Sequence, residues 1–153
     1  MNYKHTQIGY LMIIITLAVL ILFARAYILA RAEPPSVDSG TNFLVTTIMT
    51  LILFILASFC SLQVIIDEQY LQIKFGYGIY IKKFLLGDIA TAKSVKNKWY
   101  YGWGIRGWLW PKMRIYNVSG FDAVEIKLKN GKTYRIGTDE PNKLEETILR
   151  LIK

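Results

Sequence analysis

The sequence predicts two membrane-spanning helices followed by a small, mostly β domain that ends in a helix. Three observations lead to this fold class. Two long apolar runs without a charge lie near the start of the chain, apolar and polar residues alternate after residue 62, and the last residues carry an apolar stripe at helical spacing. With 153 residues, the chain has room for one compact domain besides its membrane segments.

The first apolar run begins at Ile8 and continues for 17 residues without a charge, and the pattern resumes after Arg25. A helix over residues 8–30 is long enough to cross a hydrocarbon core of about 30 Å, with Arg25 snorkelling at the far interface. The alternative is a secretory signal peptide, because Lys4 precedes the run and small residues flank Arg25. The run exceeds the roughly 7–15 residues typical of a signal peptide, which favours a retained helix.

The second run covers residues 43–62 and contains 20 residues without a charge, so it predicts another spanning helix. The segment between the runs, residues 31–42, contains Pro34, Pro35 and Gly40 and cannot be helical throughout. We therefore expect a membrane anchor over residues 1–62 and a separate domain over residues 63–153.

The distribution of basic residues predicts the orientation of the anchor. Three of the 19 Lys and Arg residues precede residue 63, and the remaining 16 follow it. The positive-inside rule then places both termini and the C-terminal domain in the cytoplasm, with the short loop 31–42 outside. The net charge of +8 also favours an anionic partner, although the same charges could serve only to fix the topology.

The C-terminal domain shows the period-two alternation of half-buried strands, most clearly where Val124, Ile126 and Leu128 share one face. Asn130-Gly131 suits a two-residue type I′ turn. A final helix follows Pro141, with Leu144, Ile148 and Leu151 on one side. Six or seven antiparallel strands are expected, at residues 63–66, 70–75, 79–84, 88–95, 112–118, 123–129 and 132–136.

Several stretches resemble the bacterial membrane proteins that carry a pleckstrin-homology-like (PH-like) domain. They are Tyr101-Gly-Trp-Gly-Ile-Arg106, Tyr116 to Val124, Asn130-Gly131 and Ile136 to Pro141, placed after two apolar segments. The likeness covers residues 62–152 in detail and the two spans in outline. It implies a PH-like barrel of two orthogonal sheets capped by the C-terminal helix, in a protein of the bacterial cell membrane. It implies no substrate or ligand, and the phosphoinositide-binding signature of eukaryotic PH domains is not recognisable between Ile65 and Lys83.

The residue types argue against an enzyme. The chain has one histidine, His5, and one cysteine, Cys60, whereas metal-ligand clusters and Ser-His or Cys-His nucleophiles need several such groups together. We therefore predict no catalytic residues, no metal and no cofactor. Residues 102–107 match G-x-G-x-x-G, but Pro111 follows where a nucleotide-binding fingerprint needs a helix, so a tight loop is expected instead.

Aromatic and basic residues alternate over residues 96–114, which we call the aromatic–basic segment. Trp and Tyr favour the headgroup level of a membrane, and Lys and Arg attract anionic lipid. The same aromatic residues could instead pack within the fold, while Lys82, Lys83 and Lys132 are expected on solvated faces. The candidates for lipid or partner contact are Lys96, Lys98, Trp99, Tyr101, Trp103, Arg106, Trp108, Trp110 and Lys112.

The sequence thus predicts a non-enzymatic, membrane-anchored binding or scaffolding module at the inner leaflet. Its expected partners are the lipid bilayer, anionic lipid headgroups, and a protein partner or a second copy of the chain. Aromatic and basic residues also suit single-stranded nucleic acid, but a two-span anchor argues against that partner. The alternative function is an accessory subunit of a larger membrane complex.

Overall fold

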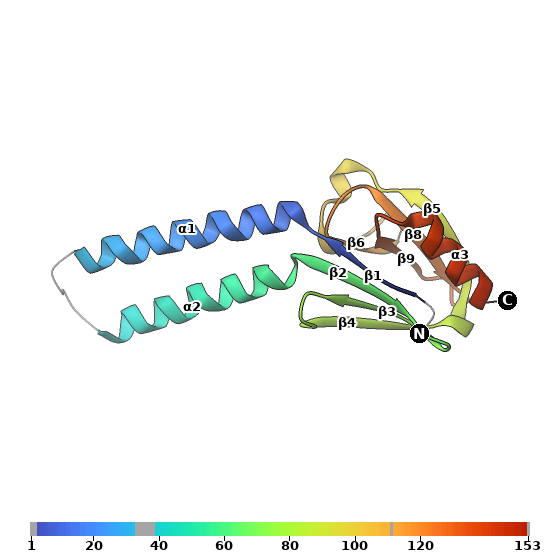
Figure 1. The fold of residues 1–153 in the computed structure, drawn as a ribbon, viewed down its shortest axis with the longest axis horizontal. Coiled ribbons are helices and arrows are strands. Elements are labelled where there is room, and N and C mark those ends of the chain that lie inside the picture. Colours follow the sequence, from blue (N-terminus) through green and yellow to red (C-terminus); the bar gives the residue numbers. More distant parts are fainter. Residues whose placement is uncertain (1–2, 33–38, 111, 153) are drawn as a thin grey trace.

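The computed structural model describes residues 3–32, 39–110 and 112–152. A pair of antiparallel helices projects from one end of a β domain, which gives the molecule an elongated shape (Figure 1). Residues 33–38 of the expected external loop lie outside the described part of the chain. The main elements are β1 (Tyr3–Ile8), α1 (Tyr10–Ala32), α2 (Ser39–Ser58), β2 (Ser61–Ile66), β3 (Tyr70–Phe75), β4 (Tyr80–Leu85), β5 (Ile89–Lys96), β6 (Gly104–Trp108), β7 (Met113–Asn117), β8 (Asp122–Leu128), β9 (Thr133–Gly137) and α3 (Pro141–Leu151), with 3-10 turns η1 (Leu86–Asp88) and η2 (Trp99–Tyr101).

Helix α1 is apolar all round, and none of its side chains is buried. By length and composition it can cross a membrane. The segment Asn42–Ser58 of α2 is apolar but shorter, so the described residues contain one clear spanning helix rather than the two expected. The second helix also ends at Ser58, not at residue 62, because Cys60 and Ser61 accept backbone hydrogen bonds from Gly9 and Gly76.

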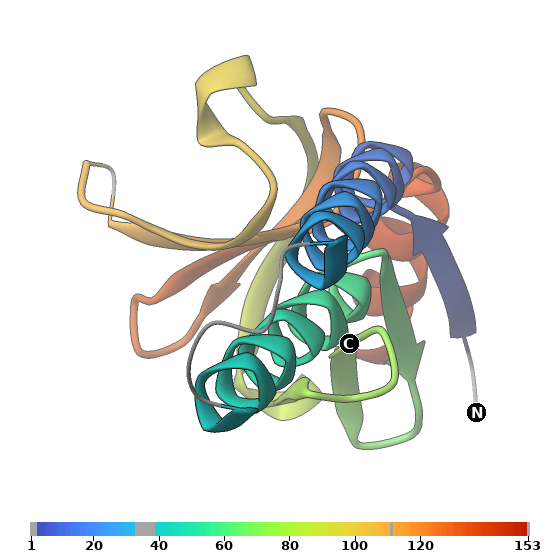
Figure 2. The same cartoon turned by 90° about the vertical axis from the view of Figure 1, so that its left-hand side faces the viewer.

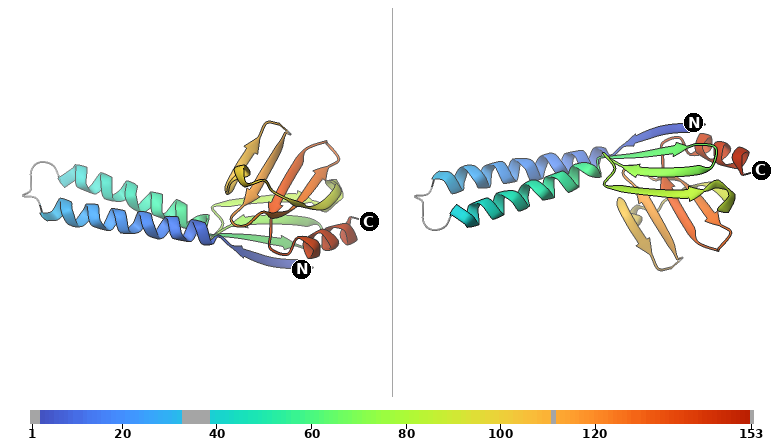
Figure 3. Two further views of the ribbon diagram at one scale, coloured as in Figure 1. Left: turned by 90° about the horizontal axis from the view of Figure 1, so that it is seen from above. Right: turned by 90° about the horizontal axis from the view of Figure 1, so that it is seen from below.

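A strand that the sequence analysis did not anticipate precedes α1. This strand, β1, pairs antiparallel with β2, so that Ile8 lies opposite Ser61 and Tyr3 opposite Ile66. The helices continue from these two strands with almost no linker, and Figure 3 shows the α1–α2 pair as an extension of the β1–β2 ladder. Residues 3–8 are therefore part of the β domain.

The strands form two separate sheets, in the orders β1-β2-β3-β4 and β5-β8-β9-β7-β6. The expected barrel of six or seven antiparallel strands differs from the structure in three respects. Nine strands are described, no strand of one sheet is hydrogen-bonded to a strand of the other, so the barrel is not closed, and β7 pairs parallel with β9. Strand β6 lies within the stretch expected to be a tight loop, because residues 104–108 pair with β7.

Aromatic side chains join the two sheets at the centre of the core. Tyr134 of β9 meets Phe84 of β4, with ring centroids 4.8 Å apart, while Tyr116 of β7 lies against both Phe75 and Tyr80. Pairs with this spacing contribute stability beyond the apolar area they bury. Helix α3 covers β5 and β8, where it buries Leu144 and Ile148 completely and leaves Leu151 half-buried.

The β8–β9 hairpin expected at Asn130-Gly131 is confirmed, with a different turn. The N–H of Gly131 donates to the Leu128 carbonyl, and the N–H of Leu128 donates to the Lys132 carbonyl. Gly131 has a φ of 81°. This pattern is typical of a longer loop that ends in a left-handed glycine, rather than a two-residue type I′ turn.

Gly76 provides a test of the junction between α2 and the first sheet. A Cβ atom at Gly76 would lie 2.5 Å from the Ser58 carbonyl oxygen, and its φ is 48°. We expect Gly76→Ala to lower the free energy of unfolding by more than the roughly 1–3 kcal/mol of backbone strain alone. Thermal unfolding in detergent micelles, followed by circular dichroism, measures this loss.

Gly120→Ala is the matched control, because its φ of 66° imposes similar strain while no atom lies within 4 Å of the added Cβ. The free energy of unfolding should fall clearly less for Gly120→Ala than for Gly76→Ala. Equal losses would mean that the contact with Ser58 does not matter.

Candidate functional site

The structure divides the aromatic–basic segment into a packed part and an exposed part. Tyr101 is buried with Met113 and Ile115 in a small cluster apart from the main core, and Trp108 packs against it. The ring centroids of Tyr101 and Trp108 are 5.1 Å apart. These two predicted contact residues therefore lie within the fold, as the packing interpretation expected.

The exposed part consists of two tips. Trp99 on η2 is 77% exposed, while Leu109 and Trp110, in the turn after β6, are each 90% exposed. Leu109 and Trp110 are adjacent in the chain, so these two side chains form a continuous exposed apolar tip. Trp103, which lies between these tips in the sequence, is half-buried. The basic candidates are all exposed, namely Lys96, Lys98, Arg106 and Lys112.

Contacts between aromatic and basic side chains order the base of the exposed part. Lys98 lies over the ring of Tyr100, 5.6 Å from its centroid, and a hydrogen bond with Tyr100 raises the pKa of the Lys98 ammonium. Tyr100 in turn packs on Trp108 with ring centroids 5.6 Å apart. Arg106 donates from Nε to the carbonyl oxygen of Trp103 at 3.2 Å. The positive charge is therefore held beside the exposed aromatic tips.

The end of the β domain nearest the helices carries further aromatic side chains. Tyr77, in the turn between β3 and β4, stacks on Phe54 of α2 with ring centroids 4.9 Å apart and donates its hydroxyl to the Phe54 carbonyl at 2.7 Å. Tyr10 at the start of α1 is exposed. Turn η2 also lies toward this end of the domain in Figure 1 and Figure 3. Aromatic residues are thus concentrated where the helices leave the domain.

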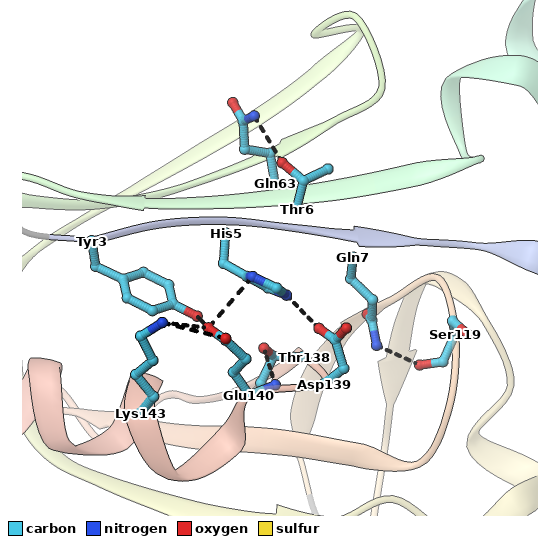
Figure 4. Close-up of polar contacts among 10 residues, drawn as sticks. All are labelled: Tyr3, His5, Thr6, Gln7, Gln63, Ser119, Thr138, Asp139, Glu140 and Lys143. Atoms are coloured by element: carbon cyan, nitrogen blue, oxygen red, sulfur yellow. Dashed lines mark hydrogen bonds and ion pairs between the residues drawn. The ribbon is translucent and has the colours of Figure 1, made fainter.

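A polar cluster joins β1 to the start of α3, and no sequence pattern predicted it, although His5 is the chain's one histidine (Figure 4). His5 Nε2 contacts Asp139 Oδ1, and His5 Nδ1 lies 3.4 Å from Glu140 Oε2. Glu140 also contacts Lys143 at 3.2 Å and accepts a hydrogen bond from Tyr3 at 3.4 Å. Both ring nitrogens of His5 therefore face carboxylate oxygens of the residues that precede α3.

The same cluster changes the acidity of Tyr3. Burial raises the pKa of the Tyr3 phenol to about 12, and the negative charges of Glu140 and Asp139 act in the same direction, while a hydrogen bond with Thr138 opposes them. Gln7 extends the contact along β1 by donating to the Ser119 carbonyl at 3.0 Å. Alternate residues of β1 thus hold the strand against α3 and the neighbouring loops.

Within residues 3–32, 39–110 and 112–152, no group of three or more His, Cys, Asp and Glu side chains could hold a metal ion. Searches among protein-family models, characterised proteins and solved structures found no match to this chain. The exposed aromatic tips with their basic neighbours form the candidate functional site.

His5→Ala tests the contact between β1 and α3. We expect it to lower the free energy of unfolding by about 1 kcal/mol, because charge-assisted contacts are lost but Asp139 is 62% exposed and solvent screens the pair. Hydrogen exchange should increase most in the β1 amides. Lys4→Ala, which changes an exposed residue of the same strand, should leave exchange unchanged. Similar exchange in the two variants would contradict a role for the cluster.

The Tyr3 phenol predicts a loss of stability at alkaline pH. Its pKa is about 12 in the folded protein against an ordinary value of 10.0, so its contribution to stability is fully present below pH 10 and is lost as the pH rises through 12. Tyr3→Phe should therefore show a shallower fall of Tm between pH 10 and pH 12 than the unchanged protein. Parallel curves over this interval would count against the assignment.

Proposed function

We propose that this chain is a membrane-anchored, PH-like binding module that docks on anionic lipid headgroups at the cytoplasmic face of a bacterial cell membrane. One observation carries the proposal. Helices α1 and α2 continue without a linker from the paired strands β1 and β2, so the β domain is held directly at the surface that the helices enter. A domain held in this way keeps its exposed side chains beside the headgroups.

The pairing of β1 with β2 supports two crossings. Residues 3–8 and 61–66 are hydrogen-bonded in one sheet. The start of α1 and the end of α2 therefore lie on the same side of any membrane. If α1 crosses, α2 must return. With 20 residues, α2 extends about 30 Å at a rise of 1.5 Å per residue, which matches the hydrocarbon core.

Strand β1 also favours a retained first helix over a cleaved signal peptide. Cleavage after the apolar run would remove the strand that covers the edge of β2 and carries His5 to Asp139. The 16 basic residues that follow residue 62 support a cytoplasmic position for the β domain. Two packed sheets with a C-terminal helix support the PH-like interpretation, without a closed barrel.

The exposed tips supply the proposed lipid contact. Trp99, Leu109 and Trp110 expose large apolar surfaces, and Lys98, Arg106 and Lys112 place positive charge nearby. Aromatic side chains of this kind partition to the headgroup region, where each basic group adds about 1 kcal/mol of attraction to anionic lipid. We propose a non-enzymatic role, which is supported by the use of the chain's one histidine in the contact between β1 and α3.

Tryptophan quenching tests the docking. In the full-length chain reconstituted into nanodiscs that contain brominated phosphatidylglycerol, we expect the fluorescence of the exposed tryptophans to be quenched more strongly than with brominated phosphatidylcholine. Trp99→Phe together with Trp110→Phe should remove most of this difference, because these two side chains are the most exposed of the four tryptophans.

Trp108→Phe is the matched control, since Trp108 packs on Tyr101, and it should retain the difference. High salt should reduce the effect of phosphatidylglycerol because the attraction is electrostatic. Equal quenching by the two lipids in the unchanged protein would rule out docking on anionic headgroups.

A second candidate function is an accessory subunit of a larger membrane complex or of a homo-oligomer. The two helices enclose a cavity of about 550 Å³ near their far ends, lined in part by Tyr27, Arg31, Phe43 and Met49. A helix of a partner protein could fill this space. Purification of the chain in mild detergent with a stoichiometric membrane partner would favour this function over lipid docking.

A further inference from the structure

A second site lies at the open side of the two-sheet domain. A cavity of about 700 Å³ is bounded by β4 of the first sheet and by β6, β7 and β9 of the second, and four basic side chains line it. They are Lys82, Lys112, Arg114 and Lys132. A smaller cavity of about 300 Å³ shares Lys82 and Lys132 and includes Lys83, with Asp88 as its acidic group.

The four cations of this cavity are not paired with a carboxylate among the described residues, although Asp88 lines the smaller cavity with Lys82 and Lys132. Across the parts of the chain that the structure describes, none of the four basic side chains forms an ion pair with a carboxylate, whereas Arg135 on the adjacent strand pairs with Glu125 at 2.8 Å. Positive charges gathered around one concave surface repel each other and attract an anion. This surface therefore favours the binding of an anion.

Edge protection explains only part of this arrangement. Lys82 is half-buried on the inner face of β4, an edge strand, and its ammonium lies 5.8 Å from the centroid of the Phe84 ring. Inward-pointing charges of this kind prevent edge strands from pairing with other chains. Arg114, however, lies on β7, which has a neighbour on both sides, so protection of an edge gives no reason for its charge.

Gly107 leaves room beside Arg114. The two residues are opposite each other in the β6–β7 pair, and a Cβ atom at Gly107 would have no other atom within 4 Å. Its backbone is outside the left-handed region, so neither conformation nor packing requires glycine there. Glycine within a strand costs stability and often marks the close approach of a ligand. Here it opens the space next to the guanidinium.

We propose that this cavity binds an organic phosphate. The planar guanidinium of Arg114 suits a phosphate group through paired N–H donors, and Lys82 and Lys132 neutralise the remaining charge. The buried Tyr134 provides an apolar wall for the organic part of the ligand. The phosphate can belong to a soluble compound or to a lipid headgroup.

The cavity overlaps the proposed docking residues only in part. The turns β6–β7 and β8–β9, which contribute to its lining, project to the same side of the domain and away from the axis of the helix pair (Figure 2). Leu109 and Lys112 line the cavity, whereas Trp99 and Trp110 do not. Variants of Arg114 and Gly107 therefore test the cavity, and variants of Trp99 and Trp110 test the docking.

Titration with pyrophosphate tests the proposal. The full-length chain, in nanodiscs of phosphatidylcholine, is titrated with pyrophosphate and followed by calorimetry. We expect saturable binding with one site per chain. Arg114→Gln should weaken it by at least about tenfold, as expected for the loss of a charge-assisted hydrogen bond. Lys93→Gln, an exposed change on the far edge strand β5, should leave the affinity unchanged.

Gly107→Glu gives an independent test, because a carboxylate enters the open space without backbone strain. It should weaken pyrophosphate binding by at least about tenfold, while Gly107→Ala, which fits the same space, should preserve binding. Thermal unfolding of each variant identifies any that fail to fold. The pair of glycine variants keeps the test valid if Arg114→Gln is unstable.

The same titration in nanodiscs that contain phosphatidylglycerol separates the two sources of phosphate. Weaker pyrophosphate binding in that membrane, at a salt concentration that screens the repulsion between its surface and pyrophosphate, means that the lipid headgroup competes for the cavity, whereas unchanged binding identifies a soluble organic phosphate. The proposal is overturned if pyrophosphate shows no saturable binding in phosphatidylcholine nanodiscs. It is also overturned if Lys93→Gln weakens binding as much as Arg114→Gln, since the effect would then be general charge screening.

Discussion

The rest of the structure depends on the antiparallel pairing of β1 with β2. These strands flank the helix pair in sequence. Their hydrogen bonds therefore hold the start of α1 and the end of α2 together at one side of the domain. The N–H of Gly9 donates to the Cys60 carbonyl and continues the pairing to the base of the helices. Because no flexible linker intervenes, the orientation of the β domain relative to the helices follows from backbone geometry.

This pairing makes the two open sides of the β domain different. On one side, β1 brings Tyr3, His5 and Gln7 against α3 and the loops before it, and these polar contacts close the gap between the sheets. On the other side, β4 faces β7 and β9 across a cavity whose basic side chains have no carboxylate partner among the described residues. The closed side stabilises the domain, and the open side remains accessible to a ligand.

Periodic patterns predicted much of this fold. The strand at residues 70–75, the β8–β9 hairpin and the final helix follow directly from the spacing of their apolar residues. Strand β1 was missed because its inward face carries Tyr3, His5 and Gln7, which read as a polar tail, and β6 was missed because glycines at 104 and 107 suggested a loop. Lys82 was expected in solvent, since only the register of β4 shows that its side chain points inward.

The anchor also changes how strong each contact must be. A domain tethered at the bilayer meets lipid at a high effective concentration, so weak contacts by Trp99 and Trp110 are sufficient to hold it against the headgroups. Selectivity cannot come from such tips, because aromatic partitioning and diffuse positive charge do not distinguish one anion from another. A concave surface with a guanidinium, three ammonium groups and an aromatic wall can distinguish them. Under the proposed function, the tips therefore position the domain, and recognition of a particular ligand falls to the cavity around Arg114.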